Sequence, residues 1–532
     1  MIEDIWFGSG ANLTSAAFVA WREWNFSRTF MTPPAVDVSQ TGVHGSSTGR
    51  WWLQFGGVLY NCSVMMNSVA LGRHIGQFEP FEFDVTELLA PPGQSNSLTV
   101  TTLPFAGGNV TRFEQQIYHN PNNTYTGQPS CWLNVNSPAW LGRTLYGWDF
   151  VPAVYTQGIW REVSLHATRT AAAAVGGATT AATTVRAAAL SVIPRLQPPY
   201  TIANLQLSLE LQIVGGGGAS ELPSVVVNWA IAPPASSTAL GAKLSTQHTL
   251  HAGGGGDGVQ TLVVTTNLTL PRPDLWHPNG YGAQPLYRAS AVVLPPTRST
   301  EMDSTVVKFG VRELTVGTNP HIAAGWSYTQ YGPEHTETVP WGWGSWQATV
   351  SPPIPANVTA WQVLINGRNV FLRGGNWIPR DQLFGRGVRE KDRTTAILLA
   401  AKHAGYTFMR VRSSPFRADH LTPPFLPSED PFFVVVQRQV WGGGLIEDSH
   451  FYDECDRLGL MLLQEFPHAG CAPGGPGDSM PDTATRLPLD KAQTVMGLKQ
   501  LVNHPSIVRY NCKCSDFLGL CLLSSCFLLA AV

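Results

Sequence analysis

The chain has 532 residues, which corresponds to three or four domains at about 100–200 residues each. Hydrophobic residues make up 43%, enough for packed cores, whereas charged residues make up only 13% and the formal net charge is −2. This balance gives no reason to expect a nucleic acid or an anionic membrane as a partner.

Residues 1–168 contain short β-rich runs separated by Gly, Pro, Asn and Ser. Residues 51–55 and 97–103 are two of these runs, and no long stretch with a helical period interrupts them. The pattern predicts a β-sandwich. The first residues show neither the basic nor the apolar region of a signal peptide, and the sequence leaves the compartment open.

A second β-rich region follows a low-complexity segment. Residues 169–189 are rich in Ala, Thr and Gly, so we expect a linker there. Residues 190–317 are predicted to form an immunoglobulin-like sandwich, and residues 318–354 are expected to be a second linker. The β-rich runs of this sandwich are 202–209, 224–230 and 261–270.

From about residue 355 strands and helices alternate. A strand is expected at 370–373, helices at 390–403, 450–458 and 490–502, and further strands at 407–411, 460–464 and 507–510. Such alternation predicts a parallel sheet, either doubly wound or a (β/α)₈ barrel. Only about four strands are expected before residue 512, so 355–511 is predicted to be the first half of a barrel.

Two segments do not fit this alternation. Residues 412–440 are Pro-rich and lack a period, although structureless loops beyond about 12–15 residues are uncommon. Residues 512–532 are apolar and hold four of the eight Cys, whereas the other four are scattered, without metal-ligand spacing or a disulfide framework. Translated non-coding sequence would explain both segments, and a genuine lineage-specific loop is the alternative for the first. No metal and no cofactor is expected.

Several segments resemble family 2 glycoside hydrolases of the β-mannosidase type, and they occur in the family's order. They are, from the N-terminus, 78–86, 147–150, 158–161, 275–282, 309–312, 374–379, 441–444, 451–456 and 503–507. The resemblance implies a galactose-binding-like jelly-roll sandwich, an immunoglobulin-like sandwich and a TIM barrel whose chemistry lies at the carboxyl ends of its strands.

The same resemblance implies hydrolysis of terminal, non-reducing β-D-mannose residues of oligosaccharides or glycoprotein glycans. Endo-β-mannosidase and exo-β-glucosaminidase relatives are alternatives within the family. The second class of function is non-catalytic, either a module that binds carbohydrate or an inactive chain. Relatives occur in lysosomes or vacuoles, outside the cell or in the cytoplasm, and the sequence indicates neither compartment nor oligomeric state.

By resemblance, the substrate-binding residues are Trp148, Asp149, Asn376, Trp377, Arg410 and Trp441. Asp149 is expected to reach over the barrel mouth and accept hydrogen bonds from sugar hydroxyls, which a carboxylate does strongly. Trp377 is expected to form the floor of the sugar subsite by stacking. From the residues alone, a turn-capping Asp, a packing Trp and a buried structural Arg remain open for Asp149, Trp377 and Arg410.

Retaining glycosidases use two carboxylates about 5–5.5 Å apart. In the family, the acid/base Glu follows an Asn just after the fourth barrel strand, and the nucleophile belongs to a later strand. Here Asn511 is followed by Cys512, and no Asn-Glu pair appears. Glu465 stands where relatives usually show Asp and is expected to support the site without taking part in chemistry. We therefore expect no catalytic residue in 1–532 and no hydrolysis by it.

Overall fold

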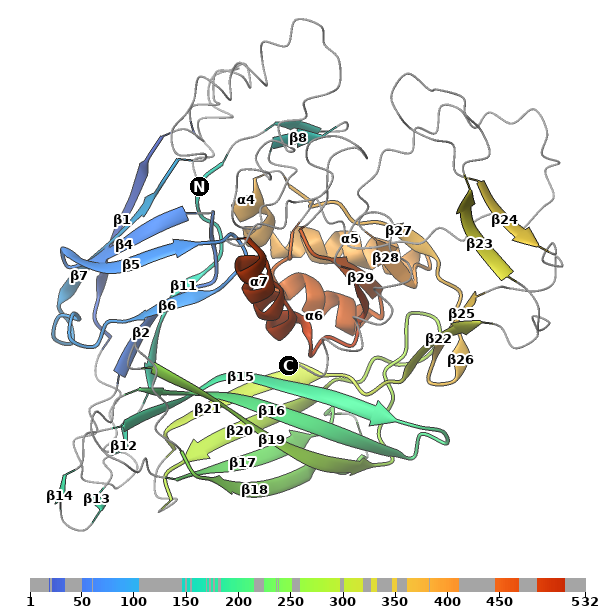
Figure 1. Cartoon of the computed structure of the whole chain (residues 1–532), viewed down its shortest axis with the longest axis horizontal. Coiled ribbons are helices and arrows are strands. Elements are labelled where there is room, and N and C mark those ends of the chain that lie inside the picture. Colours follow the sequence, from blue (N-terminus) through green and yellow to red (C-terminus); the bar gives the residue numbers. More distant parts are fainter. Residues whose placement is uncertain are drawn as a thin grey trace, which may run out of the picture.

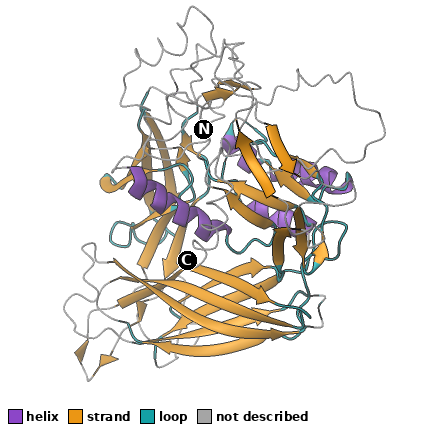
Figure 2. Cartoon of the chain, turned by 45° about the vertical axis from the view of Figure 1, so that its right-hand side comes forward, coloured by secondary structure: helices purple, strands orange, loops and turns teal. Residues whose placement is uncertain are grey.

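The computed structural model describes the chain from residue 19 to residue 511 with gaps, the largest of which are 34–49, 105–145, 215–223, 251–258, 319–326, 333–346, 352–360, 411–444 and 468–485. The predicted insert 412–440 and tail 512–532 lie outside the described residues. The strands form groups in chain order (Figure 1), and the helices gather in the C-terminal one (Figure 2). Within the described ranges, no helix is long and apolar enough to span a membrane.

The first group of strands forms a β-sandwich, as predicted. One sheet has the order β1-β7-β4-β5 and the other β11-β2-β6, while β10 pairs with β3. Exposed and buried residues alternate along β7, so Leu98 and Val100 reach the core that contains Phe55 and Val64. The strands are β1 (Trp24–Met31), β2 (Arg50–Phe55), β3 (Val58–Leu59), β4 (Asn61–Met66), β5 (Val69–Ile75), β6 (Phe81–Asp84), β7 (Ser95–Thr102), β10 (Gly158–Ile159) and β11 (Val163–Thr168).

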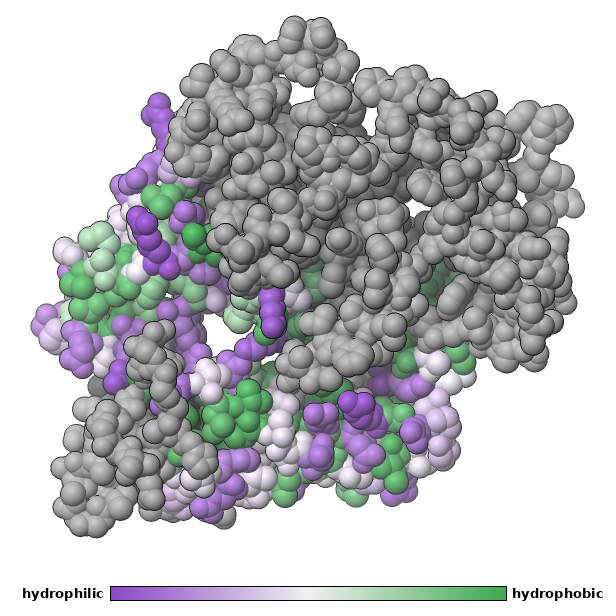
Figure 3. All heavy atoms as spheres, viewed as in Figure 1, coloured by the Kyte–Doolittle hydropathy of each residue, from purple (hydrophilic) through white to green (hydrophobic). Residues whose placement is uncertain are grey.

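The second group forms two four-stranded sheets, β12-β15-β16-β19 and β18-β17-β20-β21. They enclose a core that includes Trp229 and Tyr287, whereas polar and apolar residues are mixed on the outer surface (Figure 3). The immunoglobulin-like sandwich is therefore confirmed as a fold class. Its strands, with a small hairpin of β13 and β14, are β12 (Thr170–Ala171), β13 (Ala174–Val175), β14 (Ala178–Thr179), β15 (Thr183–Leu196), β16 (Ile202–Val214), β17 (Val225–Ala232), β18 (Ala242–His248), β19 (Val259–Pro271), β20 (Tyr287–Leu294) and β21 (Asp303–Phe309).

Both segments expected to be linkers contain strands. β15 starts at Thr183, within 169–189, because Thr184 and Val185 are fully buried and pair with β16. Thr and Val favour strands even in a low-complexity context. In 318–354, β23 (Ser327–Gly332) pairs with β24 (Gln347–Ser351). A further sheet joins β22 (Leu314–Thr318), β25 (Trp361–Ile365) and β26 (Arg368–Asn369) across that segment.

The C-terminal group is built on a four-stranded parallel sheet in the order β27-β28-β29-β30. This agrees with the predicted first half of a barrel. The strands are β27 (Gly374–Asn376), β28 (Phe408–Arg410), β29 (Met461–Glu465) and β30 (Ile507–Asn511), and the helices are α4 (Phe384–Arg389), α5 (Lys391–His403), α6 (Ser449–Leu458) and α7 (Arg486–Leu501).

Local capping explains the bounds of α6, which begins one residue before the predicted helix at 450–458 and ends where predicted. The Asp448 carboxylate accepts a hydrogen bond from the Phe451 amide, and Gly459 ends the helix with a φ of 75°. The helix predicted at 490–502 instead begins at Arg486.

Residues 370–373 form no strand, so this prediction is wrong. The first strand of the parallel sheet is β27, which begins at Gly374. The Thr407 hydroxyl oxygen accepts a hydrogen bond from the Arg373 amide at 2.9 Å and donates one to the Phe371 carbonyl oxygen at 2.8 Å. A side-chain hydroxyl thus occupies the backbone groups that a strand would use.

Gly374 provides a test of the pairing between β27 and β28. A Cβ at this position would lie 1.6 Å from the Phe408 carbonyl oxygen, so the two strands would have to separate. We expect Gly374→Ala to lower the free energy of unfolding by about 3 kcal/mol or more, measured by urea denaturation. The control is Gly387→Ala in α4, where a Cβ has its nearest contact at 3.9 Å, and it should be neutral or stabilise by up to about 1 kcal/mol. Equal stabilities of the two variants would contradict this packing.

Candidate functional site

The carboxyl ends of the four parallel strands lie along one edge of the sheet, where barrels of this kind carry their chemistry. The register places Asn376 of β27 beside Arg410 of β28, and Glu465 of β29 beside Asn511 of β30. Asn376 is exposed, whereas Glu465 is buried. Three of the residues predicted from the sequence therefore share this edge, although their roles remain predictions.

The other predicted residues are only partly described. Trp148 is the last residue of β8 (Tyr146–Trp148), which pairs with β9 (Val151–Ala153). Asp149 and Trp441 lie outside the described residues, and so does the expected approach of Asp149 to Trp377.

Trp377 follows β27 directly and is largely buried, at 7% exposure. Its indole Nε1 donates a hydrogen bond to Glu447 Oε1 at 3.0 Å, and its ring packs against Phe451 at a centroid distance of 4.8 Å. Trp377 and Glu447 also line one pocket with Pro379, Arg380, Asp381, Phe384, Gly387, Val388, Thr394, Leu445 and Asp448. Trp377 is thus held on both its polar and its apolar side.

Glu447 is a residue that the sequence analysis missed. It lies in the segment between β28 and α6, on the same edge of the sheet as Trp377. Burial raises the pKa of Glu447 to about 7, aided by Asp448, although Trp377, Arg161 and Arg380 act in the opposite direction. A carboxyl with such a pKa can hold or release a proton near neutrality, a property that is frequent at functional sites. Its position three residues after the Trp-Gly-Gly-Gly run was the available signal.

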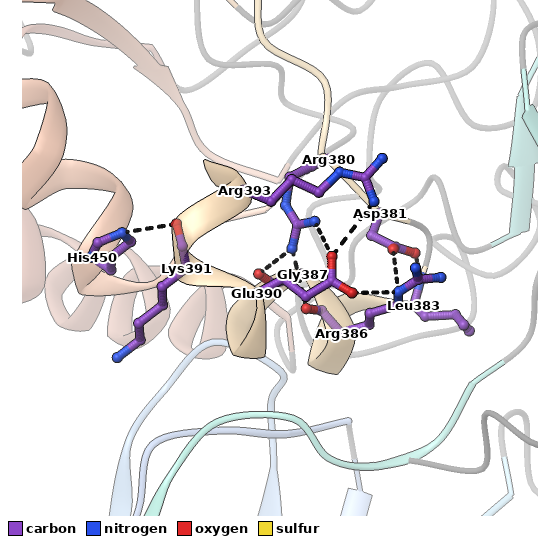
Figure 4. Close-up of polar contacts among 9 residues, drawn as sticks. All are labelled: Arg380, Asp381, Leu383, Arg386, Gly387, Glu390, Lys391, Arg393 and His450. Atoms are coloured by element: carbon purple, nitrogen blue, oxygen red, sulfur yellow. Dashed lines mark hydrogen bonds and ion pairs between the residues drawn. The ribbon is translucent and has the colours of Figure 1, made fainter. Parts of the chain in front are cut away.

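Arg380 fixes the loop that carries the pocket (Figure 4). Its Nη1 donates to Glu390 Oε2 at 2.8 Å, and its Nη2 donates to the carbonyl oxygens of Arg386 and Gly387. Hydrogen bonds from Arg386 and Arg380 lower the pKa of Glu390 to about 2. These contacts hold α4 against the start of α5, so this ion-pair cluster orders one wall of the pocket.

A different polar cluster lies at the opposite edge of the sheet, before β30. The His504 Nδ1 and Asp456 Oδ2 atoms are 2.7 Å apart, and the Ser506 amide donates to Asp456 Oδ1 at 3.0 Å. Burial alone would lower the pKa of His504, but Asp456 and Asp453 raise it above its ordinary value. Since the amino edge of such sheets mainly serves stability, we interpret the cluster as a structural brace between α6 and β30.

Glu79 is a buried carboxyl where the first sandwich meets α7. It is 8% exposed, and burial raises its pKa to about 7, against the opposing effects of its own backbone, Arg161 and Gln493. Gln493 belongs to α7. The protonation of Glu79 therefore contributes to the contact between these two parts of the chain.

We expect this contact to weaken as the pH rises. A folded pKa of about 7 against an ordinary 4.5 means that the contribution of Glu79 is fully present below about pH 4.5 and is lost by about pH 7. The difference corresponds to about 3 kcal/mol. Glu79→Gln should therefore match the wild type at acidic pH and exceed its free energy of unfolding at pH 8, as measured by urea denaturation.

The control is a variant of Asp84, whose contribution to the free energy of unfolding should change with pH in the opposite direction. Burial would raise the pKa of Asp84, but bonds from Thr86 and Arg50 hold it below its ordinary value. Asp84→Asn should lose stability at neutral pH and match the wild type only in acid. If Glu79→Gln lost stability at pH 8, the assignment of Glu79 would be wrong.

Residues 1–161 match the sequence model of the glycosyl hydrolase 2 galactose-binding domain-like family. The chain is 21% identical over 502 residues to β-mannosidase B of Thermothelomyces thermophilus, covering 94% of this chain and 44% of that protein. Thus the chain spans less than half the length of the curated relatives that it matches.

Solved structures show the same architecture. The β-D-mannosidase of Dictyoglomus thermophilum superposes with a TM-score of 0.59 at 22% identity, over 94% of this chain and 46% of that one. The exo-chitosanase of Amycolatopsis orientalis superposes with a TM-score of 0.56 at 17% identity, over 96% of this chain and 44% of that one. At these identities the similarity establishes the fold.

Proposed function

We propose, from the relationship of this chain to the family 2 glycoside hydrolases, that residues 1–532 form the sugar-binding part of an enzyme that removes terminal β-D-mannose residues from oligosaccharides or glycans. The observation that supports the proposal is the carboxyl edge of the parallel sheet, which holds Asn376 and Arg410 in register and has the pocket of Trp377 and Glu447 in the loops beside it. The mannosidase names of the relatives support the choice of sugar.

The described pocket has room for about one water molecule, so we propose that it receives a single hydroxyl of the sugar and not the whole ring. Carboxylates accept hydrogen bonds from hydroxyls, and the pocket offers those of Asp381, Glu447 and Asp448 beside the donor Arg380. The Asp149 and Trp441 side chains are proposed to complete the subsite, on the resemblance alone. Hydrolysis in this family proceeds through an acid/base and a nucleophilic carboxylate, for which we propose no residue within 1–532.

A second sugar class has an observation in its favour. The exo-chitosanase with a TM-score of 0.56 acts in the same fold, and an acidic pocket also suits the protonated amine of a glucosaminide. The two candidates differ in charge, so their affinities should respond to salt differently. Mannoside binding should be nearly independent of ionic strength, whereas glucosaminide binding should weaken as the ionic strength rises.

The test is a binding series on the 1–532 polypeptide. Methyl β-D-mannopyranoside and the corresponding glucosaminide and glucuronide are titrated by saturation-transfer NMR. We expect the mannoside to bind at least about tenfold more tightly, a difference of about 1.4 kcal/mol. Stronger binding of the glucosaminide would favour the second candidate, and no binding of any sugar would favour a chain without a sugar site.

A pair of asparagine variants separates site loss from unfolding. Asn376→Ala should weaken mannoside binding, because it removes an exposed amide at the carboxyl end of β27. Asn369→Ala removes an amide that is also exposed, from β26, away from this edge, and should leave binding unchanged. Equal effects of the two variants would contradict the proposed location.

A further inference from the structure

Two adjacent residues of the first sandwich, Trp160 and Arg161, contact the loops on the carboxyl edge of the parallel sheet. Both follow β10 directly. Trp160 is 3% exposed, and its ring lies 6.1 Å from that of Phe384 in α4, in the segment between β27 and α5. Its Nε1 donates to the Gln77 carbonyl oxygen at 2.9 Å, so the ring is fixed within its own sandwich.

Arg161 reaches the neighbouring loop. Its Nη2 donates to the carbonyl oxygens of Ile446 at 2.7 Å and Glu447 at 2.9 Å. Its Nη1 donates to the Phe78 carbonyl oxygen at 3.0 Å, within the sandwich, and to Gln500 Oε1 of α7 at 3.3 Å. One guanidinium thus joins the first sandwich, α7 and the loop that precedes α6.

The link continues to the pocket. Glu447, whose carbonyl oxygen Arg161 holds, accepts the hydrogen bond of the Trp377 indole with its side chain. The Arg161 guanidinium also lies over the Trp160 ring, 4.4 Å from its centroid, so the two residues brace each other. A planar group with five donors suits such a junction, because it binds several carbonyl oxygens at fixed angles.

We infer that Arg161 is a positioning residue, which fixes the loop before α6 and thereby the Glu447 and Trp377 side chains from the neighbouring sandwich. We propose no direct contact between the Arg161 side chain and the sugar. The expected effect of Arg161 on sugar binding rests on the proposed function, whereas its effect on the loop before α6 does not.

The test uses the 1–532 polypeptide labelled with 5-fluorotryptophan. The ¹⁹F resonance of Trp377 is assigned by its loss in Trp377→Phe. In Arg161→Met, which keeps an alkyl stem over Trp160, we expect the amides of residues 445–448 to exchange with deuterium about tenfold faster or more, because hydrogen bonds to a charged group are lost. The Trp377 resonance should shift.

The pH dependence of this resonance gives a readout that a general loss of stability would not change. Several charged or titratable groups face Glu447. They are Arg161 of the sandwich, Arg380 of the loop before α4, Asp448 of its own loop, and Tyr452 and Cys455 of α6. Its protonation should give the Trp377 resonance a midpoint near pH 7. Removing the cation in Arg161→Met should raise this midpoint, whereas Arg161→Lys should leave it nearly unchanged and still accelerate exchange.

The matched control is Arg50→Met. Arg50 of β2 pairs with Asp84 of the neighbouring strand β6, within one sheet of the first sandwich, and does not contact the barrel loops in the part of the chain that is described. It should change neither the Trp377 resonance nor exchange at 445–448. A folded Arg161→Met protein with an unchanged resonance and unchanged exchange would overturn the inference. If that variant does not fold, unchanged exchange in Arg161→Lys overturns it instead.

Sugar titrations separate this inference from the proposed function. If the wild type binds methyl β-D-mannopyranoside, Arg161→Met should bind it several-fold more weakly. If the wild type binds no sugar, the proposed function fails, while the resonance and the exchange rates still decide the role of Arg161.

Discussion

A polypeptide of residues 1–532 should hydrolyse a chromogenic β-mannoside at least about 10²–10⁴-fold more slowly than a full-length family relative, the range that one acid–base group supplies. Loss of the covalent route should lower the rate further. At the described carboxyl edge, Glu465 is 3% exposed and Glu447 is engaged by the Trp377 indole. Neither follows an Asn as the family's acid/base does.

Turnover within about a hundredfold of the relative would contradict this expectation, since one acid–base group alone contributes about that much. Glu447→Gln and Glu465→Gln would then show which carboxyl is responsible. Each replaces a carboxylate by an amide of nearly the same shape. Loss of the residual turnover in one variant and not in the other would assign the group.

Trp276→Ala should lower the free energy of unfolding by about 3–5 kcal/mol, the usual cost of truncating a buried Trp. Trp276 is fully buried and lies in a core with Ile365, Phe408 and Met461. Its Nε1 donates to the Asp456 carbonyl oxygen at 2.8 Å, which ties the immunoglobulin-like sandwich to α6. Removing it should therefore also loosen the barrel strands.

Trp229→Ala is the matched control. Trp229 is almost equally buried, at 1% exposure, and its Nε1 donates to Thr246 Oγ1 at 2.8 Å within its own sandwich. Both variants should lose similar stability in urea, but only Trp276→Ala should speed deuterium exchange in β28 and β29. Unchanged exchange there in a folded Trp276→Ala protein would contradict the coupling.

Local patterns account for the elements that the sequence predicted well. The bounds of α6 follow from Asp448 and Gly459, which lie next to the helix that they cap. The alternation along β7 likewise reports which face is buried. These signals act between neighbouring residues, so a single sequence contains them.

The features that the sequence did not predict depend on contacts between residues that are distant in the chain. The strand expected at 370–373 fails because Thr407, 36 positions from Phe371, takes its backbone carbonyl. Arg161 and Ile446 are 285 positions apart, and no local pattern connects them. The site was predicted mainly by resemblance, which marked Trp377 but not its partner Glu447.

The measurement that tests the central claim most directly is deuterium exchange of the 1–532 polypeptide with and without saturating methyl β-D-mannopyranoside. A sugar site at the carboxyl edge of the sheet, completed from the first sandwich, predicts protection at Asn376 and Trp377, at residues 445–448 and around β8. Protection confined to the outer faces of either sandwich, or no protection at a concentration that saturates binding, would contradict it.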